Sequence, residues 1–84
     1  MPRFYFHLKQ GEILVPDLEG DEFQNVSNVE AEALETARHI LSEVIKAGGD
    51  LVTEALLITD ENGRMVVTMP ISAALPKQLK ERAD

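Results

Sequence analysis

The stretch SNVEAEALETARHILSEVIKAGG, Ser27 to Gly49, predicts one long amphipathic helix around which the rest of the chain is organised. Apolar residues recur there every three or four positions, the spacing that places side chains on one side of an α-helix. This apolar stripe consists of Ala33, Leu34, Ala37, Ile40, Leu41, Val44 and Ile45. The polar side carries Glu32, Glu35, Arg38, His39, Ser42, Glu43 and Lys46. Ser27 and Glu30 have the spacing of a capping box, which predicts the helix start, and Gly48 predicts its end.

The segment before the helix predicts a β-hairpin. Arg3 to Lys9 alternates between apolar and polar residues, as a half-buried strand does, and Gln10-Gly11 suits a two-residue turn. Pairing outward from that turn opposes Lys9 to Glu12, Leu8 to Ile13 and Phe6 to Val15. Pro16 should end the second strand because proline has no N–H for the sheet.

The segment after the helix predicts a second hairpin, with strands Ala55 to Thr59 and Met65 to Met69 on either side of DENG. The turn is either a two-residue Asn62-Gly63 turn or a type I turn with Gly63 in a bulge. The first option is favoured, because its register pairs Leu56 with Met69, Ile58 with Val67 and Glu61 with Arg64. Pro70 should close the last strand.

Together these elements predict an α+β fold, in which an antiparallel sheet of two β-hairpins packs on one long amphipathic helix, in the order ββαββ. We expect a single small domain over residues 1–75. Residues 76–84 form a polar C-terminal tail, which we expect to be frayed.

Composition narrows the classes of function. The chain has 84 residues, no cysteine and a formal charge of −7. The lack of cysteine excludes disulfides, thiolate zinc sites and cysteine nucleophiles. The negative charge opposes binding to nucleic acid and to anionic membranes, so neither is expected as a partner. With no apolar segment long enough to span a bilayer, the cytoplasm is the expected location.

The acidic stretch VPDLEGDEF, Val15 to Phe23, is the main candidate site, with Asp17, Glu19, Asp21 and Glu22 as candidate partner-contact residues. A calcium-binding EF-hand loop starting at Asp17 would need glycine at its sixth position and glutamate at its twelfth, and the chain has neither there. A looser Mg²⁺ or Ca²⁺ site is the alternative to a solvated acidic turn. The turn is favoured, so no metal or cofactor is predicted.

The two histidines are interpreted as structural rather than catalytic. His7 lies on the polar side of the first strand, and no residue near it in sequence supplies the carboxylate that a general base would use. His39 lies between Glu35 and Glu43 on the polar side of the helix, which favours surface ion pairs. Signature motifs of serine hydrolases and of phosphate-binding loops are absent, so we expect a protein that is not an enzyme.

Three motifs resemble a known family: the start PRFYFH, the turn PDLEG and the hairpin DENGR. In this order they resemble the short proteins of a domain-of-unknown-function family found in rhizobia and related alphaproteobacteria. The resemblance covers about residues 1–75 and implies a small cytoplasmic bacterial protein without an assigned activity. PDLEG followed by a Glu- and Ala-rich helix is also similar to HicB-type antitoxins, whose small α+β domain neutralises a basic toxin.

The sequence therefore predicts a non-catalytic interaction or adaptor module that self-associates, for instance as a homodimer, through an exposed sheet edge or apolar patch. The alternative is a HicB-like antitoxin or regulator, in which the acidic surface with Asp17, Glu19, Asp21 and Glu22 docks a basic protein. In both interpretations the partner is a protein.

Overall fold

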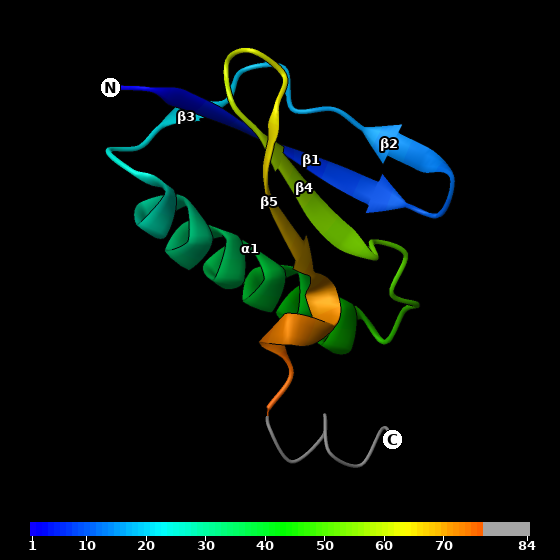
Figure 1. Ribbon diagram of the computed structural model, residues 1–84. Helices are drawn as coiled ribbons and strands as arrows, with labels where there is room; N and C mark the ends of the chain where they lie inside the picture. The colour runs from blue at the N-terminus through cyan, green and yellow to red at the C-terminus, as the bar shows by residue number, and fades with distance from the viewer. Residues whose placement is uncertain (77–84) are drawn as a thin grey trace.

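The computed structural model describes residues 1–76 and shows one antiparallel sheet with one long helix on one of its faces (Figure 1). In chain order the elements are β1 (Arg3–Gln10), β2 (Ile13–Val15), β3 (Asp21–Glu22), α1 (Val26–Ala47), β4 (Ala55–Thr59), β5 (Met65–Pro70) and the 3₁₀ helix η1 (Ile71–Ala74). The sheet order is β2-β1-β4-β5, and β3 also pairs with β1. The α+β class is confirmed. Most of the tail that we expected to be frayed lies outside the described residues.

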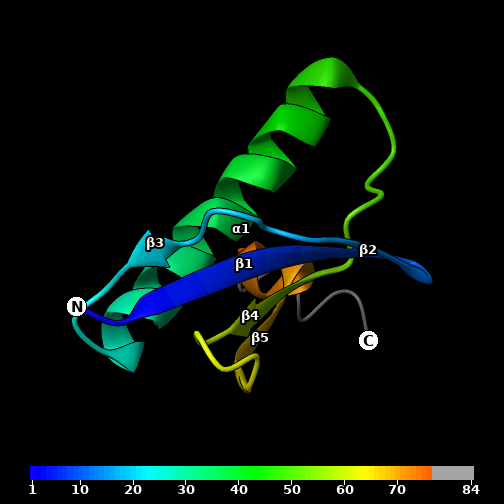
Figure 2. The same cartoon turned by 90° about the horizontal axis from the view of Figure 1, so that it is seen from above.

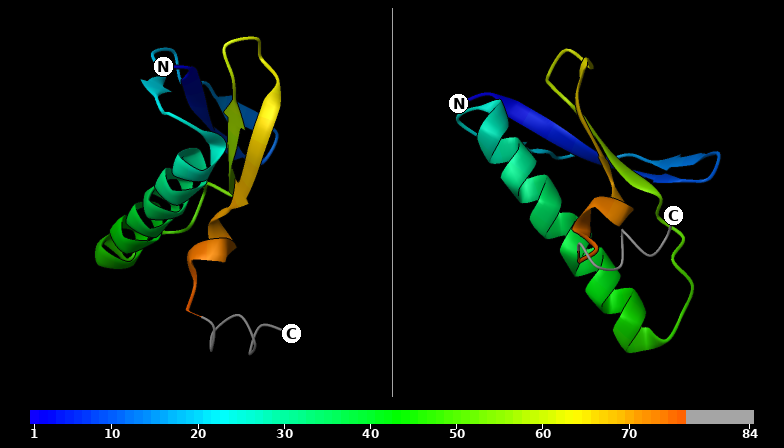
Figure 3. Two further views of the ribbon diagram at one scale, coloured as in Figure 1. Left: turned by 60° about the vertical axis from the view of Figure 1, so that its left-hand side comes forward. Right: turned by 60° about the horizontal axis from the view of Figure 1, so that its bottom comes forward.

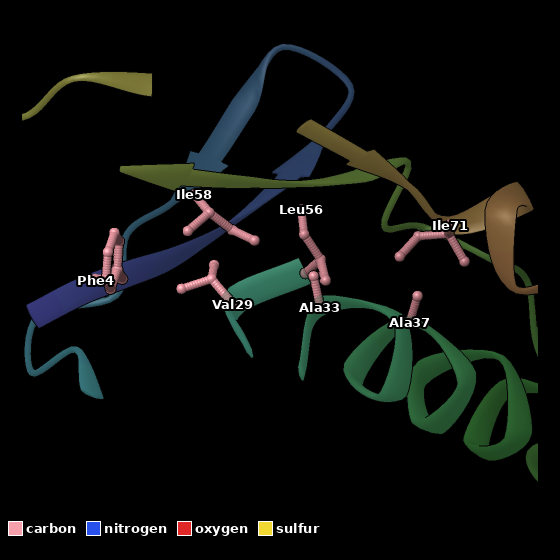
Figure 4. Packing of buried hydrophobic residues seen from close by; sticks show 7 residues of the cluster. All are labelled: Phe4, Val29, Ala33, Ala37, Leu56, Ile58 and Ile71. Carbon is pink, nitrogen blue, oxygen red and sulfur yellow. The ribbon is translucent and has the colours of Figure 1, made fainter. Parts of the chain in front are cut away.

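The core lies between α1 and the sheet face that it covers (Figure 4). Val29, Ala33 and Ala37 are buried on the helix because their 3.6-residue spacing points them at the sheet. The sheet and η1 meet them with large apolar side chains, namely Phe4, Leu56, Ile58 and Ile71. Small residues on the helix and large ones on the strands bring the two layers close together.

The β1–β2 hairpin differs from the prediction in its register. Its two-residue loop is Gly11-Glu12, and the pairs are Gln10–Ile13, Lys9–Leu14 and Leu8–Val15. Gly11 has φ +64°, the left-handed conformation that favours glycine at the first central position of such a loop. The predicted Gln10-Gly11 turn is therefore wrong. The alternation of faces survives, because the register moves Val15 from Phe6 to Leu8 on the same face.

The acidic stretch is not only a connection, as the ββαββ order implied. Asp21–Glu22 forms the short strand β3, which pairs with Arg3 and Phe4 of β1. β2 and β3 thus occupy the same edge of β1, and the loop at residues 16–20 separates them (Figure 2). The second strand of the first hairpin is therefore interrupted rather than ended.

The helix begins two residues earlier than the capping-box pattern predicted. Asn25 is the N-cap, and its side-chain Oδ1 accepts a hydrogen bond from the backbone N–H of Asn28 at 2.9 Å. Asparagine is as good a cap as serine, so the local sequence did not distinguish the two positions. The predicted end is confirmed: Gly48 has φ +66°, and its N–H donates to the Ile45 carbonyl.

The β4–β5 hairpin has the turn that was not favoured. Gly63 N–H donates to the Asp60 carbonyl at 3.0 Å, and Gly63 has φ +79°, which identifies a type I turn followed by a glycine bulge. Asp60 N–H donates to the Arg64 carbonyl, so Glu61 does not face Arg64. The pairs Leu56–Met69 and Ile58–Val67 are nevertheless confirmed, because a register shift between Ile58 and Thr59 compensates for the different turn.

Candidate functional site

The candidate site is the loop Val15–Gly20, and the Asp17 side chain organises it. Its Oδ2 accepts a hydrogen bond from the backbone N–H of Phe6 at 3.0 Å. Its Oδ1 accepts from the N–H groups of Glu19 at 3.2 Å and Gly20 at 3.1 Å. Phe6 lies where neither β2 nor β3 pairs with β1. The carboxylate therefore replaces the missing strand partner and closes the loop at the same time.

His7 supports the same loop from β1. The Asp17 N–H donates to His7 Nδ1 at 3.1 Å, and His7 Nε2 lies 3.0 Å from Thr59 Oγ1 on β4. The ring also stacks on Tyr5, with centroids 6.5 Å apart. The histidine is thus structural, as predicted, although its contact with Asp17 could not be inferred from the hairpin register predicted from the sequence.

Gly20 is where the loop returns to β1, and only glycine fits there. Its φ is +68°, and a Cβ atom at this position would lie 2.8 Å from the Phe4 carbonyl oxygen and 2.8 Å from Cε2 of the Tyr5 ring. Both the backbone conformation and the close approach of the two chain segments exclude a side chain.

The other acidic candidates do not converge with Asp17 on one point. Glu19 uses its backbone carbonyl, which accepts from Arg3 Nη1 at 2.9 Å, while its side chain is exposed. Asp21 accepts from the Glu22 N–H at 2.9 Å, and Glu22 lies 3.8 Å from Arg3. Asp17 is therefore a buried organiser of the loop, and the other three residues remain on the surface.

A shallow hollow of about 240 Å³ lies between this loop and the first half of α1. Its lining residues are Phe6, Asp17, Gly20, Asp21, Phe23, Glu32 and Thr36. The Phe6 and Phe23 rings contact each other with centroids 5.7 Å apart. The sequence analysis did not include Phe23, Glu32 and Thr36 in the site. The i, i+4 spacing of Glu32 and Thr36 was the available signal, since it places them on one side of the helix.

A second surface feature is the exposed apolar edge at β2. Figure 3 shows that the β1–β2 hairpin extends beyond α1, so the helix does not cover its tip. Ile13, Leu14 and Val15 are all exposed there, and Leu18 of the adjacent loop is more exposed still. The loop before β4 joins the same end of the molecule, because Glu54 N–H donates to the Lys9 carbonyl. It adds exposed Leu51 and Val52.

Comparison with known proteins gives one family. Residues 3–72 match a protein family described as a domain of unknown function, DUF6894. The chain belongs to the DUF6894 family. No curated protein and no solved structure matches this DUF6894 chain. The predicted resemblance to a family of unknown function is therefore confirmed.

The motif residues that carried this resemblance hold the DUF6894 fold together. Arg3 bonds to Glu19 and His7 bonds to Asp17, so the PRFYFH start is tied directly to the PDLEG turn. In the hairpin, Asp60 Oδ1 accepts from the N–H groups of Asn62 at 2.8 Å and Arg64 at 3.0 Å. These residues have structural roles, so the motif by itself does not identify a reacting group.

The electrostatics of the DUF6894 loop favour an ionised Asp17. Its partial burial acts to raise its pKa, but the hydrogen bonds from the amides of Phe6, Gly20 and Glu19, together with the charge on His7, lower it below the usual 3.8 overall. Within residues 1–76, no three acidic or histidine side chains are grouped so that they could hold a metal ion. No helix in the same range has the length and apolar character needed to cross a bilayer.

Proposed function

We propose that this DUF6894 chain is a non-catalytic protein-interaction module that self-associates through the edge strand β2. The observation that supports this is three consecutive apolar residues at a sheet edge: Ile13 is 66% exposed, Leu14 49% and Val15 40%. Natural proteins usually protect edge strands with charged or inward-turned residues, because an open edge invites a further strand. β2 has apolar side chains on both of its faces.

A second copy can pair with β2 about a two-fold axis through Leu14. In that antiparallel arrangement Ile13 faces Val15 of the other copy, and Glu12 faces Pro16, so no two carboxylates are opposed. Pro16 has no N–H, which limits the pairing to about three residues on each strand. The expected dimer is consequently weak and depends on concentration.

The contacts of His7 and Asp17 support a non-catalytic role. Both nitrogens of the His7 ring are in hydrogen bonds within the fold, and the Asp17 carboxylate already accepts from three backbone amides. A general base needs a free position within hydrogen-bond reach of a substrate proton. Neither group offers one in this arrangement.

Leu14→Lys tests the self-association. It places two like charges opposite each other at the two-fold axis, and we expect at least about ten-fold weaker dimerisation. Analytical ultracentrifugation over a range of protein concentrations measures the change. Ile45→Lys is the matched control, because Ile45 is 75% exposed but lies on α1, away from β2. A wild-type chain that stays monomeric at high concentration, or an equal effect of both variants, contradicts the proposal.

A second candidate function, a regulator that docks a basic protein, is favoured by the surplus of negative charge. Among the described residues, Arg3, Lys9, Arg38 and Lys46 each lie within 4.0 Å of a glutamate carboxylate. Asp21 and Glu32 have no such cation beside them and line the hollow next to Phe6 and Phe23. Carboxylates beside aromatic rings suit a lysine or arginine side chain. This is the HicB-like alternative.

Charge reversal of Asp21 and Glu32 tests this candidate, and it leaves Asp17 in place because that residue holds the loop together. Tagged wild-type chain and the variant with both Asp21→Lys and Glu32→Lys are used for capture from the native host at two salt concentrations. Asp50→Lys is the control, since Asp50 is exposed in the loop after α1. A partner that is lost at high salt and in the double variant, but retained by the control, supports docking at the hollow. A partner that is insensitive to salt, or that the double variant still binds, contradicts it.

A further inference from the structure

We propose that His7 is a pH-sensitive latch, which holds the Val15–Gly20 loop against β1 when the ring is neutral and releases part of that loop when the ring is protonated. The inference does not depend on self-association or on a basic partner. It follows from the direction of one hydrogen bond. The loop that it controls connects the two halves of the interrupted edge strand and carries exposed Leu18.

The hydrogen bonds of His7 determine which nitrogen carries the proton. A backbone amide can only donate, so His7 Nδ1, 3.1 Å from the Asp17 nitrogen, must be the acceptor. The neutral ring therefore carries its hydrogen on Nε2, which donates to Thr59 Oγ1 at 3.0 Å. Protonation adds a hydrogen at Nδ1. Two donors then face each other, and the bond to the loop is lost.

The groups around the ring make the loss consequential. On β1 the ring faces Tyr5 on one side, and Lys9 follows two residues later on the same face, with its charge paired to Glu54 at 2.7 Å. On β4 the partner is the neutral hydroxyl of Thr59. The loop contributes the Asp17 carboxylate, which attracts a protonated His7.

That carboxylate cannot serve the protonated ring without a cost to the loop. Its two oxygens already accept from the N–H groups of Phe6, Glu19 and Gly20. A new donor at His7 Nδ1 competes with these amides for the same oxygens. Protonation therefore removes one hydrogen bond and weakens others that close the loop, while the core between α1 and the sheet is not involved.

Amide hydrogen exchange by NMR tests the latch on the wild-type chain. As the pH falls from about 8 to about 5, where an unperturbed histidine takes up its proton, protection of the Asp17 amide should fall about five-fold, the change expected for one hydrogen bond. Exchange rates are corrected for their intrinsic pH dependence. The Asn28 amide, which bonds to Asn25 at the helix N-cap, should keep its protection and serves as the internal reference.

Two variants and one direct observation separate the latch from a general effect of acid. His7→Gln cannot take up the proton and should abolish the pH dependence of the loop amides, whereas His39→Gln, on the polar side of α1, should preserve it. Nitrogen spectra of the wild-type imidazole should show the Nε2–H form at high pH. An Nδ1–H form at high pH, or titration of His7 without any change at the Asp17 amide, would overturn the inference.

Discussion

Gly20→Ala should lower the free energy of unfolding by about 2–4 kcal/mol, a large part of the stability of a small domain. The added Cβ meets the Phe4 carbonyl oxygen and the Tyr5 ring, each at 2.8 Å, so the loop or β1 has to move. The left-handed backbone at φ +68° adds about 1 kcal/mol of conformational strain. Urea unfolding followed by circular dichroism measures the loss.

Gly11→Ala is the matched control for that experiment. Gly11 has nearly the same backbone conformation, with φ +64°, but nothing lies within 4 Å of the position of its added Cβ. We expect only the conformational cost of about 1 kcal/mol for this variant. The close approach of the loop to β1 would be refuted if the two substitutions destabilised the chain equally.

Asp17→Ala should cost about 2–3 kcal/mol, because three backbone amides lose their acceptor and each hydrogen bond contributes about 1 kcal/mol. The Phe6 amide is the most affected, since no strand pairs with β1 at that position. Asp21→Ala, which removes a carboxylate that bonds only to the Glu22 amide, should cost less than about 1 kcal/mol. Equal losses would mean that Asp17 is no more than another surface carboxylate.

The contribution of Asp17 should also depend on pH, with a direction set by its lowered pKa. A carboxyl group with a lower pKa in the folded state binds its proton more weakly there than in the unfolded chain. Its contribution to stability is therefore complete above the ordinary value of 3.8 and is lost as the pH falls through the lower folded value. Urea unfolding of wild type and Asp17→Asn should show a stability difference that shrinks in this acidic range.

Local sequence patterns predicted the elements well where one periodicity dominates. The α1 stripe, its end at Gly48 and the alternation of β1 follow from short-range geometry, which the tertiary structure only has to accommodate. Turns were less predictable. Gln10-Gly11 and Gly11-Glu12 are both acceptable locally, and the same holds for Ser27 and Asn25 as helix caps, so small differences in packing chose between them.

The candidate site could be predicted only in part. The acidic composition of VPDLEGDEF was visible, but nothing in its spacing showed that Asp17 turns inward while Glu19, Asp21 and Glu22 stay outside. That distinction depends on the Phe6 amide, eleven positions earlier in the chain. Likewise, Phe23 and Glu32 join the hollow because α1 packs beside the loop.

By itself, the sequence determined the fold class, the long helix, the acidic surface and the lack of cysteine chemistry, because composition and the 3.6- and 2-residue periods are properties of neighbouring residues. Only the tertiary structure decided that the edge of β1 is shared by β2 and β3, that His7 and Asp17 lock the loop between them, and that β2 extends beyond the helix. These features depend on contacts between distant segments, whose free energies differ too little between registers for local patterns to choose among them.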